Sequence, residues 1–352
     1  MMANHAARSS HRVGSKRAVL GFTIIELMVS LTIGLIILAA MTALFATASR
    51  SHRELSNAAQ QIENGSYAIS ALAEDLRHAG YYGGAYLIQA APPAALPDPC
   101  VTNNAAALTA ALAFPVQGYD APAAAPVGCV PAADFVPGTD VIVVRRASTT
   151  VTTLASLDAS DVYIQNNNDW TSASNPVVGL GLAGNFPLLK KDGLSPADVR
   201  KYYVRIYYVS ACNLYAPGAG TCTLAADGGA PVPTLKMLEL GLDPGGGALS
   251  MLNIPLAQGV ENLQVDYGID SDGDGVADTF VTSPASVADW TNITEVKVSL
   301  LVRNPNVTRG YTDTKTYTLG LSGTVSPGGA YKRHLFTQHI RLLNVAEKRE
   351  SP

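Results

Sequence analysis

The longest apolar run in the chain begins just after Glu26, and residues 27–48 contain no charged residue. A helix needs about 20 predominantly apolar residues to cross the hydrocarbon core of a bilayer, and this run is long enough. Glu26 lies four residues inside the apolar stretch that starts at Phe22. We therefore expect a transmembrane helix over residues 22–48 with one carboxylate in its first turn, where the helix dipole favours negative charge.

Helical spacing of apolar residues continues beyond this run, now with polar residues between them. Arg77 and His78 are typical of a helix end, and Gly80 is suited to the C-cap position. We expect an amphipathic continuation over residues 49–80, with an apolar stripe that a sheet must cover. The stripe is formed by Leu55, Ala58, Ala59, Ile62, Ile69, Leu72, Ala73 and Leu76.

The remaining residues, 81–352, are expected to form an extracytoplasmic β-rich domain. Residues 85–134 are rich in Ala and Pro, which predicts a long loop with little regular structure. Short β-rich runs follow, and two of them alternate apolar and polar positions as antiparallel strands do. The expected strands cover residues 141–146, 162–165, 202–209, 235–240, 260–267, 296–303, 314–319 and 336–343. Residues 166–192 and 210–233 are expected to be connecting loops. The predicted fold class is α+β, a long N-terminal helix packed on an antiparallel sheet with long loops.

The charge distribution predicts how the helix lies in a membrane. Residues 1–21 contain four basic residues and no acid, and removing these four positive charges from the net charge of −4 leaves −8 for the rest of the chain. A basic segment before an apolar helix stays in the cytoplasm, so residues beyond the helix should lie outside. The net negative charge of these remaining residues argues against a nucleic-acid partner.

Four cysteines, all beyond the apolar helix, would then lie in an oxidising compartment. Three connectivities are possible, and we favour the local pairs, Cys100 with Cys129 and Cys212 with Cys222. Neither pair has the C-x-x-C spacing of a zinc or redox site.

Residues 270–278 form the clearest candidate for metal chemistry. Their spacing follows the first nine positions of an EF-hand loop, with glycine at the sixth position. The predicted Ca²⁺ ligands are Asp270, Asp272, Asp274, Asp278 and the backbone carbonyl of Val276. Val281 stands where an EF-hand has a bidentate glutamate, and strands are expected on both sides instead of helices. The alternative is a tight Asp-Gly turn whose acids are merely solvated.

Other motifs give no catalytic hypothesis. Residues 179–184 satisfy G-x-G-x-x-G, but Asn185, Phe186 and Pro187 follow where a dinucleotide site requires a helix. No G-x-S-x-G, H-E-x-x-H or Ser/His/Asp grouping is evident. We expect the chain not to be an enzyme.

The hexad from Gly21 to Glu26 offers a reason for the intramembrane carboxylate. A charged group inside a membrane is costly and usually has a partner. Cleavage between Gly21 and Phe22 would create an α-amino group that could pair with Glu26 of a neighbouring molecule. The hexad resembles the type IV prepilin processing site, which implies cleavage after Gly21 by a prepilin peptidase, N-methylation of Phe22 and a docking role for Glu26.

Two other N-terminal processing outcomes remain open. The first is an ordinary signal anchor that happens to contain a glutamate. The second is a secretory signal peptide cut after Ala48, because residues 46–48 have an A-x-A-like pattern. A mature N-terminus at Phe22 supports the pilin interpretation, whereas Ser49 supports the signal peptide.

Three blocks, residues 21–83, 267–278 and 331–344, resemble the PilW-type minor pilins of type IV pili. Leu343 stands where we would expect arginine. The resemblance implies a filament subunit that joins other minor pilins and the major pilin through its N-terminal helix, in a priming or tip complex that supports twitching motility and adhesion. A tip adhesin would be a further partner. The chain would lie in the inner membrane before assembly and reach the periplasm and cell surface in the pilus.

Two alternatives share many of these sequence features. One is a J-type minor pseudopilin of type II secretion, which has the same N-terminus and general fold. The other is a membrane-tethered, calcium-dependent adhesin or hydrolase that never assembles.

Overall fold

The computed structural model describes residues 21–84, 93–169, 175–242 and 249–350. The expected leader, apart from Gly21, and residues 85–92 of the expected Ala/Pro-rich loop lie outside the described residues. The chain forms two units, Met1–Leu55 and Ser56–Pro352.

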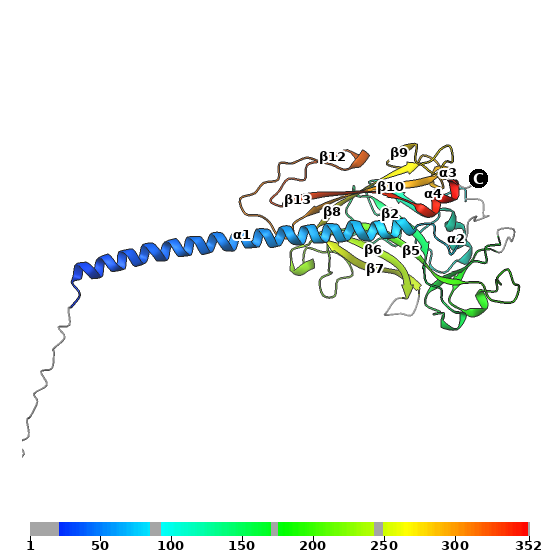
Figure 1. Cartoon of the computed structure of the whole chain (residues 1–352), viewed down its shortest axis with the longest axis horizontal. Helices are drawn as coiled ribbons and strands as arrows, with labels where there is room; N and C mark the ends of the chain where they lie inside the picture. Colours follow the sequence, from blue (N-terminus) through cyan, green and yellow to red (C-terminus); the bar gives the residue numbers. More distant parts are fainter. Residues whose placement is uncertain (1–20, 85–92, 170–174, 243–248, 351–352) are drawn as a thin grey trace, which may run out of the picture. The chain divides into compact units, whose positions relative to one another are not determined.

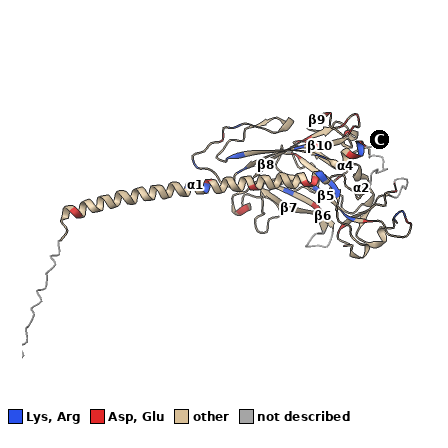
Figure 2. Cartoon of the chain, viewed as in Figure 1, with Lys and Arg blue, Asp and Glu red and all other residues tan. Residues whose placement is uncertain are grey.

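The first unit contains the beginning of helix α1 (Ile24–His78). Every side chain from residue 21 to residue 48 is exposed. Figure 2 shows this part of the helix without a charged residue beyond its first turn. Among the described helices, α1 alone is long and apolar enough to cross a membrane, with a mean hydropathy of 2.4 in its most apolar window. The expected apolar helix is therefore present, starting two residues later than predicted, with the length and composition that a membrane span requires.

The remainder of α1 buries the second half of the expected apolar stripe, Ile69, Leu72, Ala73 and Leu76, but not the first half. Its buried residues are Gln61, Gly65, Ala68, Ile69, Leu72, Ala73, Asp75 and Leu76. The apolar positions Leu55, Ala58, Ala59 and Ile62, expected to pack on the sheet, are exposed instead. The helix ends as predicted, because Gly80 has φ +76° and its amide donates to the Arg145 carbonyl at 3.0 Å.

A seven-stranded antiparallel sheet forms one layer of this unit (Figure 1). Its main path runs β1-β2-β5-β3-β4, while β6 pairs with β5 and β7 pairs with β6. The strands are β1 (Val116–Tyr119), β2 (Val141–Ala147), β3 (Val162–Gln165), β4 (Val177–Leu180), β5 (Val199–Ser210), β6 (Thr234–Leu242) and β7 (Leu249–Gln258).

A four-stranded antiparallel sheet, ordered β13-β10-β8-β9, forms the second layer. Its strands are β8 (Val260–Ile269), β9 (Thr279–Val281), β10 (Ile293–Arg303) and β13 (Arg333–Arg341). A small hairpin pairs β11 (Tyr317–Thr318) with β12 (Thr324–Val325). The short helices are α2 (Ala105–Ala110), α3 (Val287–Trp290) and α4 (Leu343–Glu350), with 3₁₀ turns at Ala111–Ala113, Leu154–Ser156, Ala183–Asn185, Ala226–Gly228 and Gly320–Ser322.

Gly259 is the joint between the two sheets, because β7 ends just before it and β8 begins just after it. It has φ +86°, and a Cβ there would lie 2.6 Å from the carbonyl oxygen of Arg303, so only glycine fits. The largest core cluster lies between the two sheets and α1. It joins helix residues such as Leu72 and Leu76 to residues of both sheets, including Ile142 and Val298.

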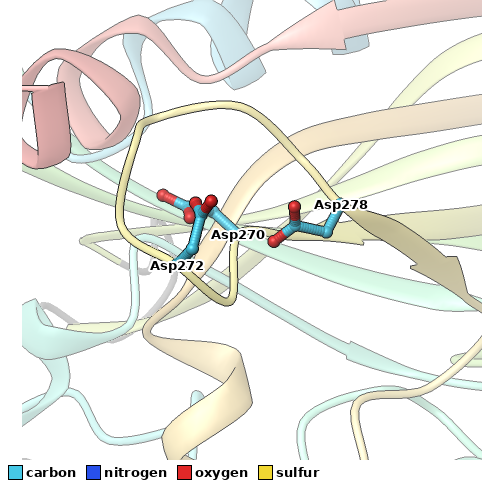
Figure 3. A group of neighbouring side chains, drawn as sticks. All are labelled: Asp270, Asp272 and Asp278. Atoms are coloured by element: carbon cyan, nitrogen blue, oxygen red, sulfur yellow. The ribbon is translucent and has the colours of Figure 1, made fainter.

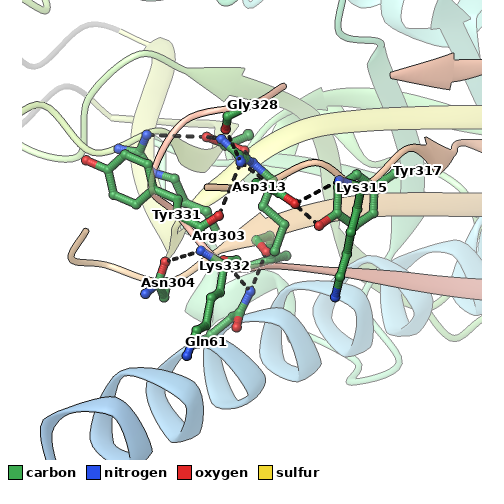
Figure 4. Close-up of polar contacts among 12 residues, drawn as sticks. Gln61, Arg303, Asn304, Asp313, Lys315, Tyr317, Gly328, Tyr331 and Lys332 are labelled. Atoms are coloured by element: carbon green, nitrogen blue, oxygen red, sulfur yellow. Dashed lines mark hydrogen bonds and ion pairs between the residues drawn. The ribbon is translucent and has the colours of Figure 1, made fainter. Parts of the chain in front are cut away.

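The segment that joins β10 to β13 is anchored by polar contacts, drawn in Figure 4. Asp313, which is buried, accepts a hydrogen bond from Arg333 at 2.9 Å. From α1, Gln61 donates to the carbonyl of Val302 at 2.6 Å. These bonds explain why a polar residue occupies the packed face of the helix.

Each expected strand coincides with an observed one, although the run at residues 314–319 contains only the two residues of β11. Two segments that were expected to be irregular contain regular structure. The region 85–134 holds α2 and strand β1, and the expected loop 166–192 holds β4. Strand β7 was not predicted at all.

Candidate functional site

The carboxylate of Glu26 closes the first turn of α1. Thr23 precedes the helix and donates to Glu26 Oε2 from its backbone amide at 3.0 Å and from its hydroxyl at 2.9 Å. The amide of Glu26 donates back to the Thr23 hydroxyl at 3.3 Å. This reciprocal arrangement is a capping box, and the spacing Thr-x-x-Glu could have revealed it in the sequence. Within the described part of the chain, Glu26 therefore has hydrogen-bond donors but no cation among them.

The expected processing bond lies in an accessible segment. Gly21 and Phe22 precede the helix, and Phe22 is 83% exposed. A Cβ built on Gly21 would meet no atom within 4 Å. Nothing in the described structure obstructs the approach of a peptidase to this bond.

The acidic loop between β8 and β9 brings together three of its four aspartates. One carboxylate oxygen each from Asp270, Asp272 and Asp278 lies within 4.8 Å of the other two. Figure 3 shows Asp278 extending from the far side of the loop toward the other two. Asp274 is not part of this group, and its carboxylate accepts the amide of Val276 at 2.8 Å.

Backbone amides hold the loop in this shape. Asp270 accepts the amides of Gly273 at 2.6 Å and Gly275 at 2.9 Å, and Asp278 accepts the amide of Ser271 at 2.7 Å. The two glycines have φ of +86° and +84°, a conformation that side-chain-bearing residues rarely adopt. The positive φ values and the hydrogen bonds from backbone amides wrap the loop around the carboxylates.

Asp270 already has a cationic partner in the fold. The carboxylate is fully buried, and Arg349 of helix α4 donates to it from Nε at 2.6 Å. Burial raises the pKa of Asp270, but the hydrogen bonds from Arg349 and the two glycine amides outweigh it, so the pKa lies below its ordinary value. The sequence pattern of the loop gave no sign of Arg349, which lies 79 residues further along the chain.

The donor set fits a hard divalent cation in part. Ca²⁺ takes six to eight oxygen ligands, and three carboxylates converge here in a loop of the expected spacing. The two exposed acids, Asp272 and Asp278, are accessible to an ion from solvent. Arg349 supplies part of the positive charge that an ion would otherwise provide.

Both disulfides are present with the local pairing expected from the sequence. Cys100 is bonded to Cys129 and Cys212 to Cys222, each with a Cα–Cα distance of 5.6 Å. The first closes the Ala/Pro-rich region, and the second closes the loop that follows β5.

Comparison with known families gives two matches. The model described as Type IV Pilus-assembly protein W, PilW, matches residues 206–344, which include the end of β5, strands β6 and β7, and the whole four-stranded sheet. The model of the prokaryotic N-terminal methylation motif matches residues 16–42, around Gly21 and Glu26. No curated protein matches the chain at a significant level. The two family matches confirm the resemblance seen in the sequence and support a PilW-type, prepilin-like pilin, a structural class of protein.

Proposed function

We propose that this chain, a PilW-type prepilin-like pilin of type IV pilus assembly, acts as a minor pilin in the complex that starts the filament or forms its tip. One observation carries the proposal: a capped carboxylate, Glu26, lies in the first turn of α1, and every side chain of this helix up to residue 48 is exposed. The same chain carries the domain that matches PilW. Twitching motility and adhesion would follow from the pilus that this complex starts.

The membrane holds such a subunit until a partner compensates the charge of Glu26. A carboxylate in the middle of a membrane costs about 2.5–3.5 kcal/mol, and less near the interface. Cleavage after Gly21 would give Phe22 a positively charged amine. Pairing of that amine with Glu26 of the adjoining pilin would place opposite charges together, while the exposed apolar side chains exchange lipid for contact with neighbouring helices.

The proposed location follows from the same features. The uncut chain would cross the inner membrane once, with its basic leader in the cytoplasm. Other minor pilins and the major pilin would contact it through the N-terminal helix, and a tip position would allow an adhesin to bind.

The test replaces Glu26 by alanine in the native host and scores surface pili, twitching and secreted proteins. Loss of pili with normal amounts of protein in the membrane supports the proposal. Loss of secretion with intact pili identifies a type II pseudopilin instead, and a change in neither identifies a tethered protein that does not assemble. Glu63→Ala is the matched control, because Glu63 is an exposed acid on the same helix outside the apolar run. N-terminal sequencing of the mature protein should begin at Phe22.

We also propose that the acidic loop binds Ca²⁺ as a structural staple between β8 and β9. The convergence of Asp270, Asp272 and Asp278 supports this role. Calorimetric titration with CaCl₂ should give binding heat for the wild type, a large loss of affinity for Asp272→Ala and a smaller loss for Asp274→Ala, because Asp274 lies outside the converging group. Absence of binding heat from the wild type would exclude the calcium site.

A further inference from the structure

We propose that docking of the C-terminal helix α4 and uptake of Ca²⁺ by the acidic loop oppose one another through Arg349. The inference rests on the calcium site proposed above and adds a means of regulating it. Arg349 is paired with Asp270, the carboxylate that an ion in the loop would need as a ligand.

The first step of the argument is the geometry of Arg349. Its Nε lies 2.6 Å from Asp270 Oδ2, and its Nη2 donates to the backbone carbonyl of Asp270 at 3.1 Å. Its Nη1 donates to Asn292 Oδ1 at 2.6 Å. The guanidinium thus binds Asp270, the first predicted ligand of the loop, and Asn292, the residue just before β10. These three hydrogen bonds can form only while α4 is docked.

The second step is the packing of α4 against the loop. A Cβ added to Gly275 would lie 2.5 Å from Glu350 Cγ and 2.8 Å from the carbonyl oxygen of Ala346. Arg341, just before the helix, donates to the Gly275 carbonyl at 3.3 Å. The loop and the helix are in direct contact, so a shift of the loop around an ion cannot leave α4 undisturbed.

The third step is the contact of α4 with the C-terminal end of α1. Asn344 donates to the carbonyls of Arg77 at 3.3 Å and Ala79 at 3.1 Å, two groups that a helix end leaves without intrahelical partners. Beside this contact lies a hollow of about 200 Å³, with Tyr81 and Tyr82 on one side and Lys348 of α4 on the other. Undocking of α4 would uncover this hollow and the end of α1.

The direction of the coupling follows from electrostatics. Arg349 and Ca²⁺ are both cations, and each gains from the negative charge of Asp270. When two cations share one carboxylate, each weakens the binding of the other. The loss of binding free energy is the same for both. Arg349 therefore lowers calcium affinity, and calcium loosens α4 to the same extent.

The experiment uses the full chain in detergent micelles. Calorimetry with CaCl₂ compares the wild type with Arg349→Gln and with Lys348→Gln, which removes the same charge from the same helix without touching the loop carboxylates. We expect Arg349→Gln to bind Ca²⁺ about 3- to 10-fold more tightly and Lys348→Gln to stay within about twofold of the wild type. Arg349→Lys, which keeps the charge, should lie between the wild type and Arg349→Gln.

Hydrogen exchange of the wild type tests the reciprocal effect without any variant. Amides of residues 343–350 should exchange faster in CaCl₂ than in EGTA, while MgCl₂ has a smaller effect. Equal or weaker binding by Arg349→Gln, or slower or unchanged exchange of α4 in calcium, overturns the coupling and leaves the calcium site intact. A wild type that binds no Ca²⁺ removes the site itself, and the coupling with it.

Discussion

Asp75 provides the sharpest test of how α1 is held on the sheet. It lies on the buried face of the helix and accepts hydrogen bonds from Arg146 at 2.8 Å, from Arg205 at 2.7 and 2.9 Å, and from the hydroxyl of Tyr207. Burial raises the pKa of Asp75, but the two arginines and the tyrosine lower it by a larger amount, so the pKa lies below the ordinary value of 3.8. The carboxylate is ionised in the folded protein at neutral pH.

Asp75→Asn keeps the shape of the side chain and removes its charge. Arg205 retains Glu239, whose carboxylate lies 2.5 Å from its Nε, whereas Arg146 is left with the ring of Tyr203, 4.7 Å away. Breaking a buried pair by removing one partner typically costs about 3–5 kcal/mol. Because asparagine keeps one acceptor and Arg205 keeps a partner, we expect a loss of about 3 kcal/mol, a large part of the 5–15 kcal/mol typical of a folded domain.

Urea unfolding of the full chain in micelles measures this loss through tryptophan fluorescence, since Trp290 is buried against Tyr267 at a centroid distance of 4.9 Å. The control is Glu74→Gln, an exposed acid on the same helix, for which we expect a change within about 0.5 kcal/mol. The lowered pKa of Asp75 also stabilises the fold above the unfolded pKa, and this stabilisation is lost as the pH falls below about 4. That acid sensitivity should be reduced in Asp75→Asn. A loss below about 1 kcal/mol, or one equal to that of Glu74→Gln, would refute the role given to the ion network.

Two further predictions concern a carboxylate between the two sheets and the contact of α1 with β13. Burial and the nearby Asp120 and Asp266 raise the pKa of Asp140 to about 7, although its carboxylate accepts the amides of Ala121 and Val265. Because the folded pKa exceeds the unfolded one, stability should fall by up to about 4 kcal/mol as pH rises from about 4 to about 7 and stay flat above. Urea midpoints across that range should show the slope in the wild type but not in Asp140→Asn. A Cβ at Gly65 would lie 2.1 Å from Phe336, so Gly65→Ala should destabilise the chain by about 1–3 kcal/mol despite its better helix propensity, and should become neutral or stabilising in a Phe336→Leu background. Destabilisation that persists unchanged in that background would contradict the steric explanation.

The sequence predicted the helix and most strands because their apolar patterns are strong and local. It placed Ile69, Leu72, Ala73 and Leu76 correctly on the buried face of the helix but missed the burial of Gln61 and Asp75, because polar residues between apolar ones were expected to face solvent. Their burial depends on the carbonyl of Val302 and the guanidinium of Arg205, 241 and 130 residues away, which no helical pattern encodes. Strand β7 was missed because Pro255 interrupts it, and an edge strand tolerates proline.

In the candidate sites too, features set by nearby residues were predictable and contacts with distant residues were not. Spacing within nine residues was enough to predict that Asp270, Asp272 and Asp278 converge. The position of Asp274 outside this group and the ion pair with Arg349 were not predictable from the spacing, because they depend on the folded loop and on a helix that lies 79 residues further along the chain. The capping role of Thr23 was readable from the sequence but was not predicted.

The order of the elements along the chain has a consequence for biogenesis. In the proposed membrane orientation, α1 would leave the export machinery first, whereas β8, β10 and β13, which cover its apolar side, occupy residues 260–341 and would leave last. Contacts across such separations form slowly, because a long loop must close before they contribute. In the location proposed above, the helix would therefore remain uncovered in the periplasm until translocation is nearly complete, and a nascent chain halted before β13 would expose an apolar surface to proteases and chaperones.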